Sequence, residues 1–304
     1  MKHFLRLIFV MILLVGLSLA IGECLVRKVP NPFKYKHEWM QQHASEVETL
    51  ILGSSHAYFG ISPSYMKHSG FNLANVSQNL KYDSFLLEQY ASDCKNLKQV
   101  VLTISYFTLF SPGFEGTKNW WNGINYKVYM DCPYHSDFSK YNFELFHLPV
   151  YAGKLRSFFQ SQSDILCDSL GWGKNYSLRN KPASWDRSLA EQAVRRHTKQ
   201  NWDYLDENEQ YLNKIAFYCQ EHSLSLVLVT MPAWPTYYEN LDKKQLNKMH
   251  ECIQELQHEY GLVYYDYLKD SRFVEEDFYD SDHLSDVGAR KFTEIFVEEC
   301  SFRF

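Results

Sequence analysis

Short apolar runs alternate with amphipathic segments along most of this chain. The apolar runs have the length and β-branched content of buried strands and occupy residues 47–52, 70–74, 98–105, 223–231 and 262–265. Apolar residues recur at helical spacing in residues 83–92, 207–221, 243–260 and 285–300. Strands that alternate with helices are typical of α/β proteins with a parallel sheet. We therefore predict a three-layer α/β/α fold around a five-stranded parallel sheet.

This regularity stops after the third predicted strand. Residues 106–202 have poor periodicity and are rich in tryptophan and glycine. We interpret residues 106–205 as a large insertion within an α/β domain of residues 46–304. Because the insertion starts at the carboxyl end of a strand, we expect it to hang over the site as a cap that selects the substrate. The alternative is that it only covers one end of the sheet.

The N-terminal residues 1–26 form an apolar segment behind a start made positive by Lys2 and Arg6. We interpret this segment as an uncleaved signal anchor, although its apolar run is shorter than the about 20 residues of a clean spanning helix. A cleaved signal peptide is the alternative. In either case we expect the basic end in the cytoplasm and the domain outside it, in the periplasm or on the extracellular face. Residues 27–45 are polar and are predicted to form a stem.

Composition excludes some classes of function. The chain has 304 residues, with 31 basic against 36 acidic side chains, so no nucleic-acid footprint is present. None of its seven cysteines forms a CxxC pair, so we expect no metal site and no cofactor. Cys132 and Cys167 share the irregular region, and a disulfide between them is an expectation for an oxidising compartment only.

A first candidate for chemistry follows the first predicted strand, at residues 53–56 with the sequence Gly-Ser-Ser-His. Open α/β sheets carry their chemistry at the carboxyl ends of strands. Gly53 allows a sharp turn, and the backbone amides that follow can stabilise an anion. The alternative is a strand that ends in a polar turn.

A second candidate lies near the far end of the chain, at residues 280–283 with the sequence Asp-Ser-Asp-His. A serine hydroxyl needs a base within hydrogen-bonding reach, and the base needs an orienting group. His283 can be this base and Asp280 its orienting group, because their spacing in a turn lets both side chains lie on one side. We take the neighbouring Asp282 as structural.

Together, the two motifs resemble those of the SGNH (GDSL) hydrolase superfamily. The resemblance covers residues 46–105 and 206–304 and is greatest to membrane-anchored branches, the alginate-type O-acetyltransferase proteins and the D-alanine-transfer protein of teichoic acid modification. It implies a flavodoxin-like sheet, with Ser55 as nucleophile, His283 as general base and Asp280 as its partner. It also implies a multi-span membrane acyltransferase as a partner protein.

The middle motifs of that superfamily are not matched in this chain. Residues 72–78 lack the glycine whose amide stabilises the oxyanion, which leaves the amides of Asn75 and Ser77 as candidates. No asparagine follows the third strand, where the hydroxyls of Ser105 and Tyr106 are the replacements. The loss of one donor typically costs about 10²–10³ in rate. We interpret His56 as a hydrogen-bonding residue and not as a second base.

Other side chains have two interpretations each. Trp234 and the pair at residues 120–121 are candidates for stacking on a glycan, against the alternative of burial in the core. The basic residues 195–197 would suit a phosphate or a uronate, but a solvated helix face is the more ordinary explanation.

These patterns lead to one hypothesis of function and one rival. The hypothesis is an exported, membrane-tethered serine esterase or O-acyltransferase that acts on a glycan ester or a small acyl ester. The rival is a non-catalytic glycan-binding or scaffold subunit of an acylation complex on the same fold.

Overall fold

The structure is a computed structural model, and it describes residues 1–135 and 138–301. Backbone contacts divide the chain into two units. The first unit comprises Met1–Glu38 and Phe114–Leu166, and the second comprises Trp39–Gly113 and Cys167–Phe304. Each unit is described below by itself.

The second unit is built on a five-stranded parallel sheet, as the sequence predicts. The strands are β1 (Thr49–Leu52), β2 (Gly70–Asn72), β3 (Gln99–Thr103), β4 (Ser225–Thr230) and β5 (Val263–Asp266). Their order is β2-β1-β3-β4-β5, the flavodoxin-like arrangement. Since all strands run in the same direction, the segments that follow them meet at one edge of the sheet.

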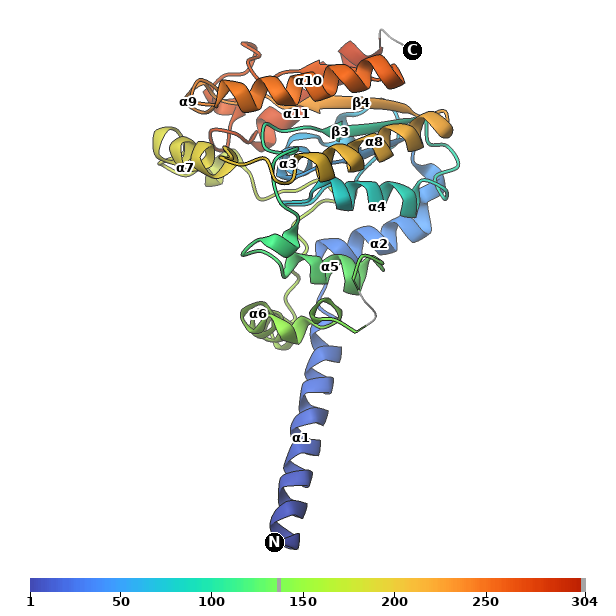
Figure 1. Cartoon of the computed structure of the whole chain (residues 1–304), viewed down its shortest axis with the longest axis vertical. Coiled ribbons are helices and arrows are strands. Elements are labelled where there is room, and N and C mark those ends of the chain that lie inside the picture. Colours follow the sequence, from blue (N-terminus) through green and yellow to red (C-terminus); the bar gives the residue numbers. More distant parts are fainter. Residues whose placement is uncertain (136–137, 302–304) are drawn as a thin grey trace. The chain divides into compact units, whose positions relative to one another are not determined.

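Helices cover both faces of this sheet, which confirms the three-layer fold (Figure 1). One face carries α4 (Leu80–Tyr90), α8 (Leu205–Glu221) and α10 (Lys243–Tyr260). The other face carries α3 (Ser55–Gly60) and α11 (Asp286–Ser301). Right-handed crossovers between parallel strands produce this division. Because both faces are covered, β1 is buried along its whole length and β3 is buried after Gln99, so both strands are largely apolar.

Shorter elements complete the second unit. They are η1 (Ala44–Glu46), η2 (Pro63–Tyr65), η6 (Leu178–Asn180), α7 (Arg187–His197), α9 (Pro235–Tyr238) and η7 (Glu275–Asp277). Helix α3 begins three residues after the end of β1 and has only six residues, too few for periodicity to predict it.

The first unit is helical. Its elements are α1 (Lys2–Val26), the first part of α2 (Pro32–His43), η3 (Phe114–Gly116), α5 (Asn122–Tyr129), η4 (Lys140–Asn142), η5 (Glu144–Phe146) and α6 (Leu148–Phe159). Helix α1 has a mean hydropathy of 2.7 over its most apolar window and is long enough to cross a membrane, a test that a signal sequence also passes. Helix α2 occupies most of the segment predicted as a stem.

Two sequence expectations concern the insertion between β3 and β4. Residues 114–166 belong to the first unit, whereas residues 167–205 belong to the second. The role of residues 106–205 as a substrate-selecting cap stays a prediction. The expected disulfide is not formed in the structure, in which Cys132 belongs to the first unit and Cys167 to the second.

Candidate active site

A sharp turn after β1 presents Ser55 at the carboxyl edge of the sheet. Gly53 has a φ of 125°, and a Cβ atom there would lie 2.1 Å from Oγ1 of Thr103. Both facts require glycine. The chain reverses at this point, with Ser54 as the N-cap of α3 and Ser55 as its first residue. Ser54 is buried, whereas Ser55 is half-buried.

A polar loop before α11 presents the other two predicted residues. Oδ1 of Asp280 accepts hydrogen bonds from the backbone N–H groups of Asp282 (3.1 Å) and His283 (2.9 Å). These two hydrogen bonds fold the backbone of the loop around the carboxylate of Asp280. The backbone N–H of Trp234, after β4, donates to the carbonyl of Ser281 (2.8 Å) and ties the loop to the sheet edge.

The three side chains form a continuous hydrogen-bonded row. Oγ of Ser55 lies 2.8 Å from Nε2 of His283. Nδ1 of His283 lies 2.9 Å and 3.1 Å from the two carboxylate oxygens of Asp280. This is the arrangement of a nucleophile, a base and an orienting acid. The structure therefore brings Ser55, His283 and Asp280 together.

The imidazole of His283 is surrounded by negative charge. Burial lowers its pKa, but the charges of Asp280 and Asp282 outweigh burial and raise the pKa to about 9. A carboxylate close to an imidazole favours the protonated ring. The site is therefore well suited to stabilise the imidazolium that forms when His283 accepts a proton.

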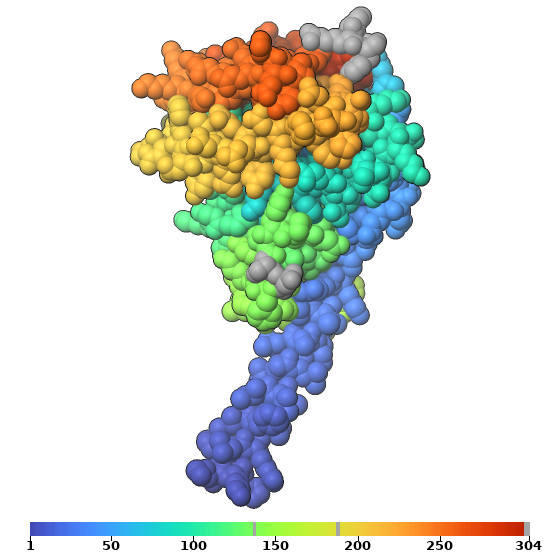
Figure 2. Space-filling view, turned by 45° about the vertical axis from the view of Figure 1, so that its right-hand side comes forward, coloured from blue at the N-terminus to red at the C-terminus, as the bar shows by residue number. Residues whose placement is uncertain are grey.

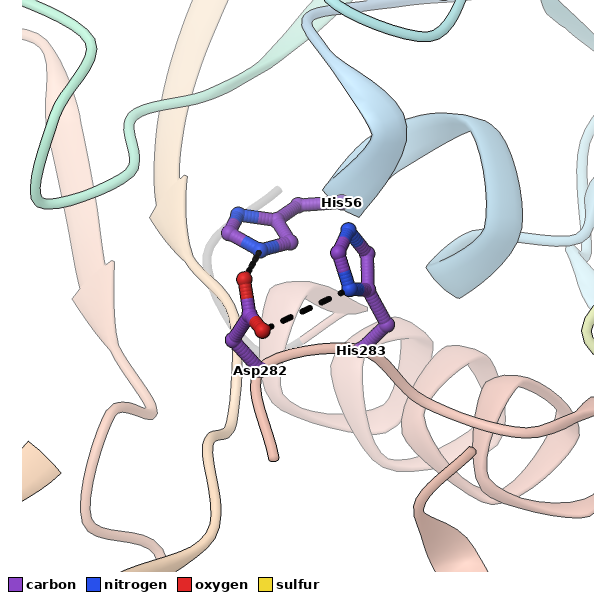
Figure 3. Close-up of side chains that lie close together, drawn as sticks. All are labelled: His56, Asp282 and His283. Atoms are coloured by element: carbon purple, nitrogen blue, oxygen red, sulfur yellow. Dashed lines mark hydrogen bonds and ion pairs between the residues drawn. The ribbon is translucent and has the colours of Figure 1, made fainter. Parts of the chain in front are cut away.

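A second row of the same residue types lies beside the first. Nδ1 of His56 is hydrogen-bonded to Oγ of Ser105, and Nε2 of His56 lies 3.3 Å from Oδ2 of Asp282. The other oxygen of Asp282 is 3.7 Å from Nδ1 of His283, so one carboxylate lies between two imidazoles (Figure 3). Asp282 is thus part of the site, and the interpretation of it as only structural is incomplete.

The protons in this second row can be assigned by elimination. Burial lowers the pKa of His56, so its ring is neutral and has a single N–H. Burial would raise the pKa of Asp282, but the neighbouring imidazoles hold it well below its usual range. An ionised carboxylate only accepts, so Nε2–H of His56 donates to Asp282. Nδ1 must then accept from the hydroxyl of Ser105, whose proton is not free for an oxyanion.

The other residues predicted for the oxyanion lie in different surroundings. The hydroxyl of Tyr106 is hydrogen-bonded to Oγ1 of Thr198 (3.0 Å) and accepts from the backbone N–H of Asp242 (3.1 Å). The side chain of Asn75 is buried and donates to Gln78 (3.3 Å). Ser77 is exposed in the turn after β2, with a φ of 61°.

Trp234 is half-buried next to the loop that it anchors. Its ring lies 5.3 Å from that of Trp185 and 5.5 Å from that of Phe278. The side chain of Lys181 lies over Trp185, with Nζ 3.5 Å from the ring centroid. This aromatic pair at the sheet edge leaves both sequence interpretations of Trp234 open.

Sequence reasoning missed the carboxylate that holds the nucleophile turn. Asp83, in the first turn of α4, accepts hydrogen bonds from the backbone N–H of Gly53 (2.8 Å) and from Nε2 of Gln78 (2.7 Å). Burial raises the pKa of Asp83 to about 7. The sequence shows only an acidic residue in the first turn of a helix, a common position that does not reveal a buried contact.

His197 was also missed, because it was grouped with two exposed arginines. Arg195 and Arg196 are exposed, as expected for a solvated helix face, but His197 is buried. Its Nδ1 is hydrogen-bonded to the hydroxyl of Tyr237 (2.8 Å) and lies 3.8 Å from Oδ2 of Asp282. Burial lowers the pKa of His197 to about 3, so it is a neutral neighbour of the site.

Aromatic rings enclose the imidazole of His283 from another side. Tyr176 stacks on Phe59 and on Tyr279, with ring centroids 3.7 Å and 4.0 Å apart. The rings of Tyr176 and His283 are nearly perpendicular, with their centroids 5.2 Å apart. Tyr176 comes from the second-unit part of the insertion, so residues of the insertion contribute to the wall of the site.

One group of side chains in the site has donor atoms close enough to share a metal ion. These are His56, Asp282 and His283, whose donor atoms all lie within 4.8 Å of one another (Figure 3). Each of the three side chains already has a hydrogen-bonding or ion-pair partner in the two rows. Hydrogen bonding therefore accounts for this cluster without a metal.

No family model and no curated protein matches this chain. Similar solved structures include a protein of Streptococcus pneumonia described as a candidate platelet activating factor, with 12% identity, a TM-score of 0.42, and coverage of 95% of this chain and 98% of that one. A lipase/acylhydrolase from Enterococcus faecalis has 12% identity and a TM-score of 0.38, covering 84% and 97%. A gut microbial enzyme that metabolises diltiazem has 12% identity and a TM-score of 0.40, covering 85% of this chain and 49% of that enzyme.

Proposed function

We propose that this protein is a serine esterase or O-acyltransferase that uses Ser55, His283 and Asp280 as its catalytic triad. The observation that carries this proposal is the contact between Ser55 and His283, with Oγ and Nε2 2.8 Å apart although the residues are 228 positions apart in the chain. The two sequence motifs resemble those of SGNH hydrolases, and this resemblance supports the same assignment.

In the first half-reaction, Oγ of Ser55 attacks the carbonyl carbon of an ester while its proton passes to Nε2 of neutral His283. The imidazolium is stabilised by Asp280, which accepts from Nδ1–H, and by the nearby charge of Asp282. The proton then passes from Nε2 to the leaving alkoxide as the C–O bond breaks. An acyl-Ser55 intermediate and a free alcohol result.

In the second half-reaction, His283 takes a proton from water or from an acceptor hydroxyl, whose oxygen attacks the acyl carbon. The bond to Oγ breaks, and Oγ recovers the proton from Nε2. The backbone N–H of Ser55 is the oxyanion donor that we assign, because the first N–H groups of a helix have no acceptor within it. The same residues serve hydrolysis and transfer.

The finer part of the proposal concerns substrate and place. We propose a glycan ester, or a small acyl ester as donor, at the outer side of a membrane to which α1 tethers the protein. The length and apolarity of α1 support the tether. The resemblance to membrane-anchored acyl-transfer proteins supports a multi-span membrane acyltransferase as partner, and it supports a position in the periplasm or on the extracellular face.

The test compares two adjacent serines in the full chain, purified in detergent or nanodiscs. Ser55→Ala removes the nucleophile, whereas Ser54→Ala removes a buried hydroxyl that has no hydrogen-bond partner in the described structure. We expect a loss of about 10³-fold or more in 4-nitrophenyl acetate turnover for Ser55→Ala. Ser54→Ala should stay within a few-fold of the parent protein.

Labelling by a fluorophosphonate probe, with the modified peptide identified by mass spectrometry, locates the nucleophile directly. An added oligosaccharide acceptor separates transfer from hydrolysis, since transfer yields an acylated oligosaccharide. Turnover that survives Ser55→Ala would refute the triad. A parent protein that resists the probe but binds oligosaccharide would favour the rival scaffold or glycan-binding role.

A further inference from the structure

Helix α6 in the first unit buries a charged side chain and exposes large apolar ones. Its buried residues are Tyr151 and Lys154, and Lys154 forms an ion pair with buried Glu144. Its outward residues include Leu148 and Phe159, which are 64% and 72% exposed. A helix on the surface of a water-soluble domain shows the opposite pattern, with charge outside and apolar residues inside. The outward face of α6 is therefore suited to an apolar neighbour.

The last turn of α1 is built into the same unit. Gly22, Glu23 and Val26 are buried there, and a Cβ atom on Gly22 would lie 1.9 Å from the hydroxyl of Tyr151 in α6. Helices α1 and α6 are therefore in direct contact at this point. The body of α1 continues from this contact as an uncovered apolar helix.

A polar network fixes this end of α1. The carboxylate of Glu23 accepts hydrogen bonds from the backbone N–H groups of Glu144 (3.0 Å) and Leu145 (3.1 Å). It also pairs with Arg27 at 2.8 Å. Glu23 thereby holds η5, whose Phe146 is 55% exposed and lies two residues before the start of α6. Removal of α1 would take away part of the core of the unit.

We propose that the first unit rests on the lipid bilayer that α1 crosses, with Phe146, Leu148 and Phe159 inserted at the interface. Helix α1 contacts both α6 and η5, the elements that carry these side chains, and Figure 2 shows the rest of α1 as a bare blue rod. The three side chains therefore lie near the point where the helix would enter the membrane. Aromatic and aliphatic residues on one face of a helix are typical of interfacial binding. Exposed Arg156 lies on the same helix and can reach lipid phosphates.

Photo-cross-linking in the full chain tests this proposal. The photoreactive residue benzoylphenylalanine replaces Phe159, Leu13 in α1, or Asn119, in separate samples reconstituted in nanodiscs of phosphatidylethanolamine and phosphatidylglycerol. Asn119 is the matched control, because it is exposed in the same unit and closely precedes α5. Helix α5 lies farther from the bare part of α1 than α6 does (Figure 1). Lipid adducts are measured by mass spectrometry after irradiation.

We expect lipid adducts at positions 159 and 13, with at least tenfold fewer at position 119. Adducts at position 13 without adducts at position 159 would overturn the proposal, and so would protein–protein adducts at position 159, because another protein then covers the face. No adduct at either position would also overturn it, since α1 would not lie in the bilayer. The intact mass of the protein extracted from membranes should match a chain that still contains Leu13. A mass that corresponds to cleavage within α1 would also refute the proposal.

Discussion

Two rows of serine, histidine and aspartate lie side by side at one edge of the sheet, yet they differ in access, orientation and charge. One row is Ser55–His283–Asp280 and the other is Ser105–His56–Asp282. The two imidazole rings are 4.6 Å apart, centroid to centroid. Identical residue types in the same place therefore offer an internal control for what makes a serine reactive.

The first difference is access and orientation. Ser55 is half-buried and faces Nε2 of its histidine, whereas Ser105 is 3% exposed and faces Nδ1. The second difference is charge. His283 has Asp280 in contact and Asp282 nearby, while His56 shares Asp282 with other imidazoles. The pKa of His283 is raised and that of His56 is lowered by burial, so only His283 is built to accept a proton.

Exchange of each histidine for alanine should separate the two rows most strongly. We expect His283→Ala to lower kcat/KM for 4-nitrophenyl acetate by about 10³–10⁴, because it removes the base. His56→Ala should cost only about tenfold, through the lost support of Asp282. Steady-state rates, with circular dichroism to verify folding, measure both. Equal losses in two folded variants would show that the rows act as one unit.

The next largest loss of kcat/KM is expected when the orienting carboxylate is replaced. We expect Asp280→Asn to lower kcat/KM by about 10²–10⁴, since the amide can present the wrong group to Nδ1 and hold the ring in an unproductive tautomer. The Ser55 fluorophosphonate labelling rate should fall in parallel. A variant that keeps near-parental labelling would assign the orienting role to another group, with Asp282 the nearest.

The pH dependence of kcat/KM distinguishes the role of Asp282 from that of Asp280. His283 must be neutral to act as base, and a pKa of about 9 means that it is protonated below that pH. Parental kcat/KM should therefore rise with pH up to about 9. Asp282→Asn removes one negative charge, lowers the pKa of His283 and moves this rise to lower pH by about one unit. An unmoved profile would mean that Asp282 does not act on His283.

The smallest effect should come from the buried serine. We expect Ser105→Ala to change kcat/KM by less than about tenfold, because its hydroxyl donates to His56 and not to the substrate. Fluorophosphonate labelling should stay at Ser55. A loss approaching that of Ser55→Ala would instead make Ser105 an oxyanion donor, and the proton assignment of the second row would then be wrong.

The sequence alone was enough to predict the strands, the main helices and the parallel sheet of this protein. Continuous apolar runs and helical periodicity are local signals, so the five strands and the helices α4, α8, α10 and α11 could be located from them. Strand direction followed from the alternation of elements. Ser55, His283 and Asp280 could be singled out because each lies in a short motif where a predicted strand or helix ends or begins.

Only the tertiary structure decided which polar side chains share a partner. His56 and Asp282 are 226 residues apart, and neither His197 nor Asp83 carries a local mark of its buried contacts. The burial of a charged side chain in α6 is likewise invisible until Lys154 is seen to face inward. The physical reason is that periodicity records which residues avoid water, whereas the pairing of a buried charge depends on elements that meet only after folding.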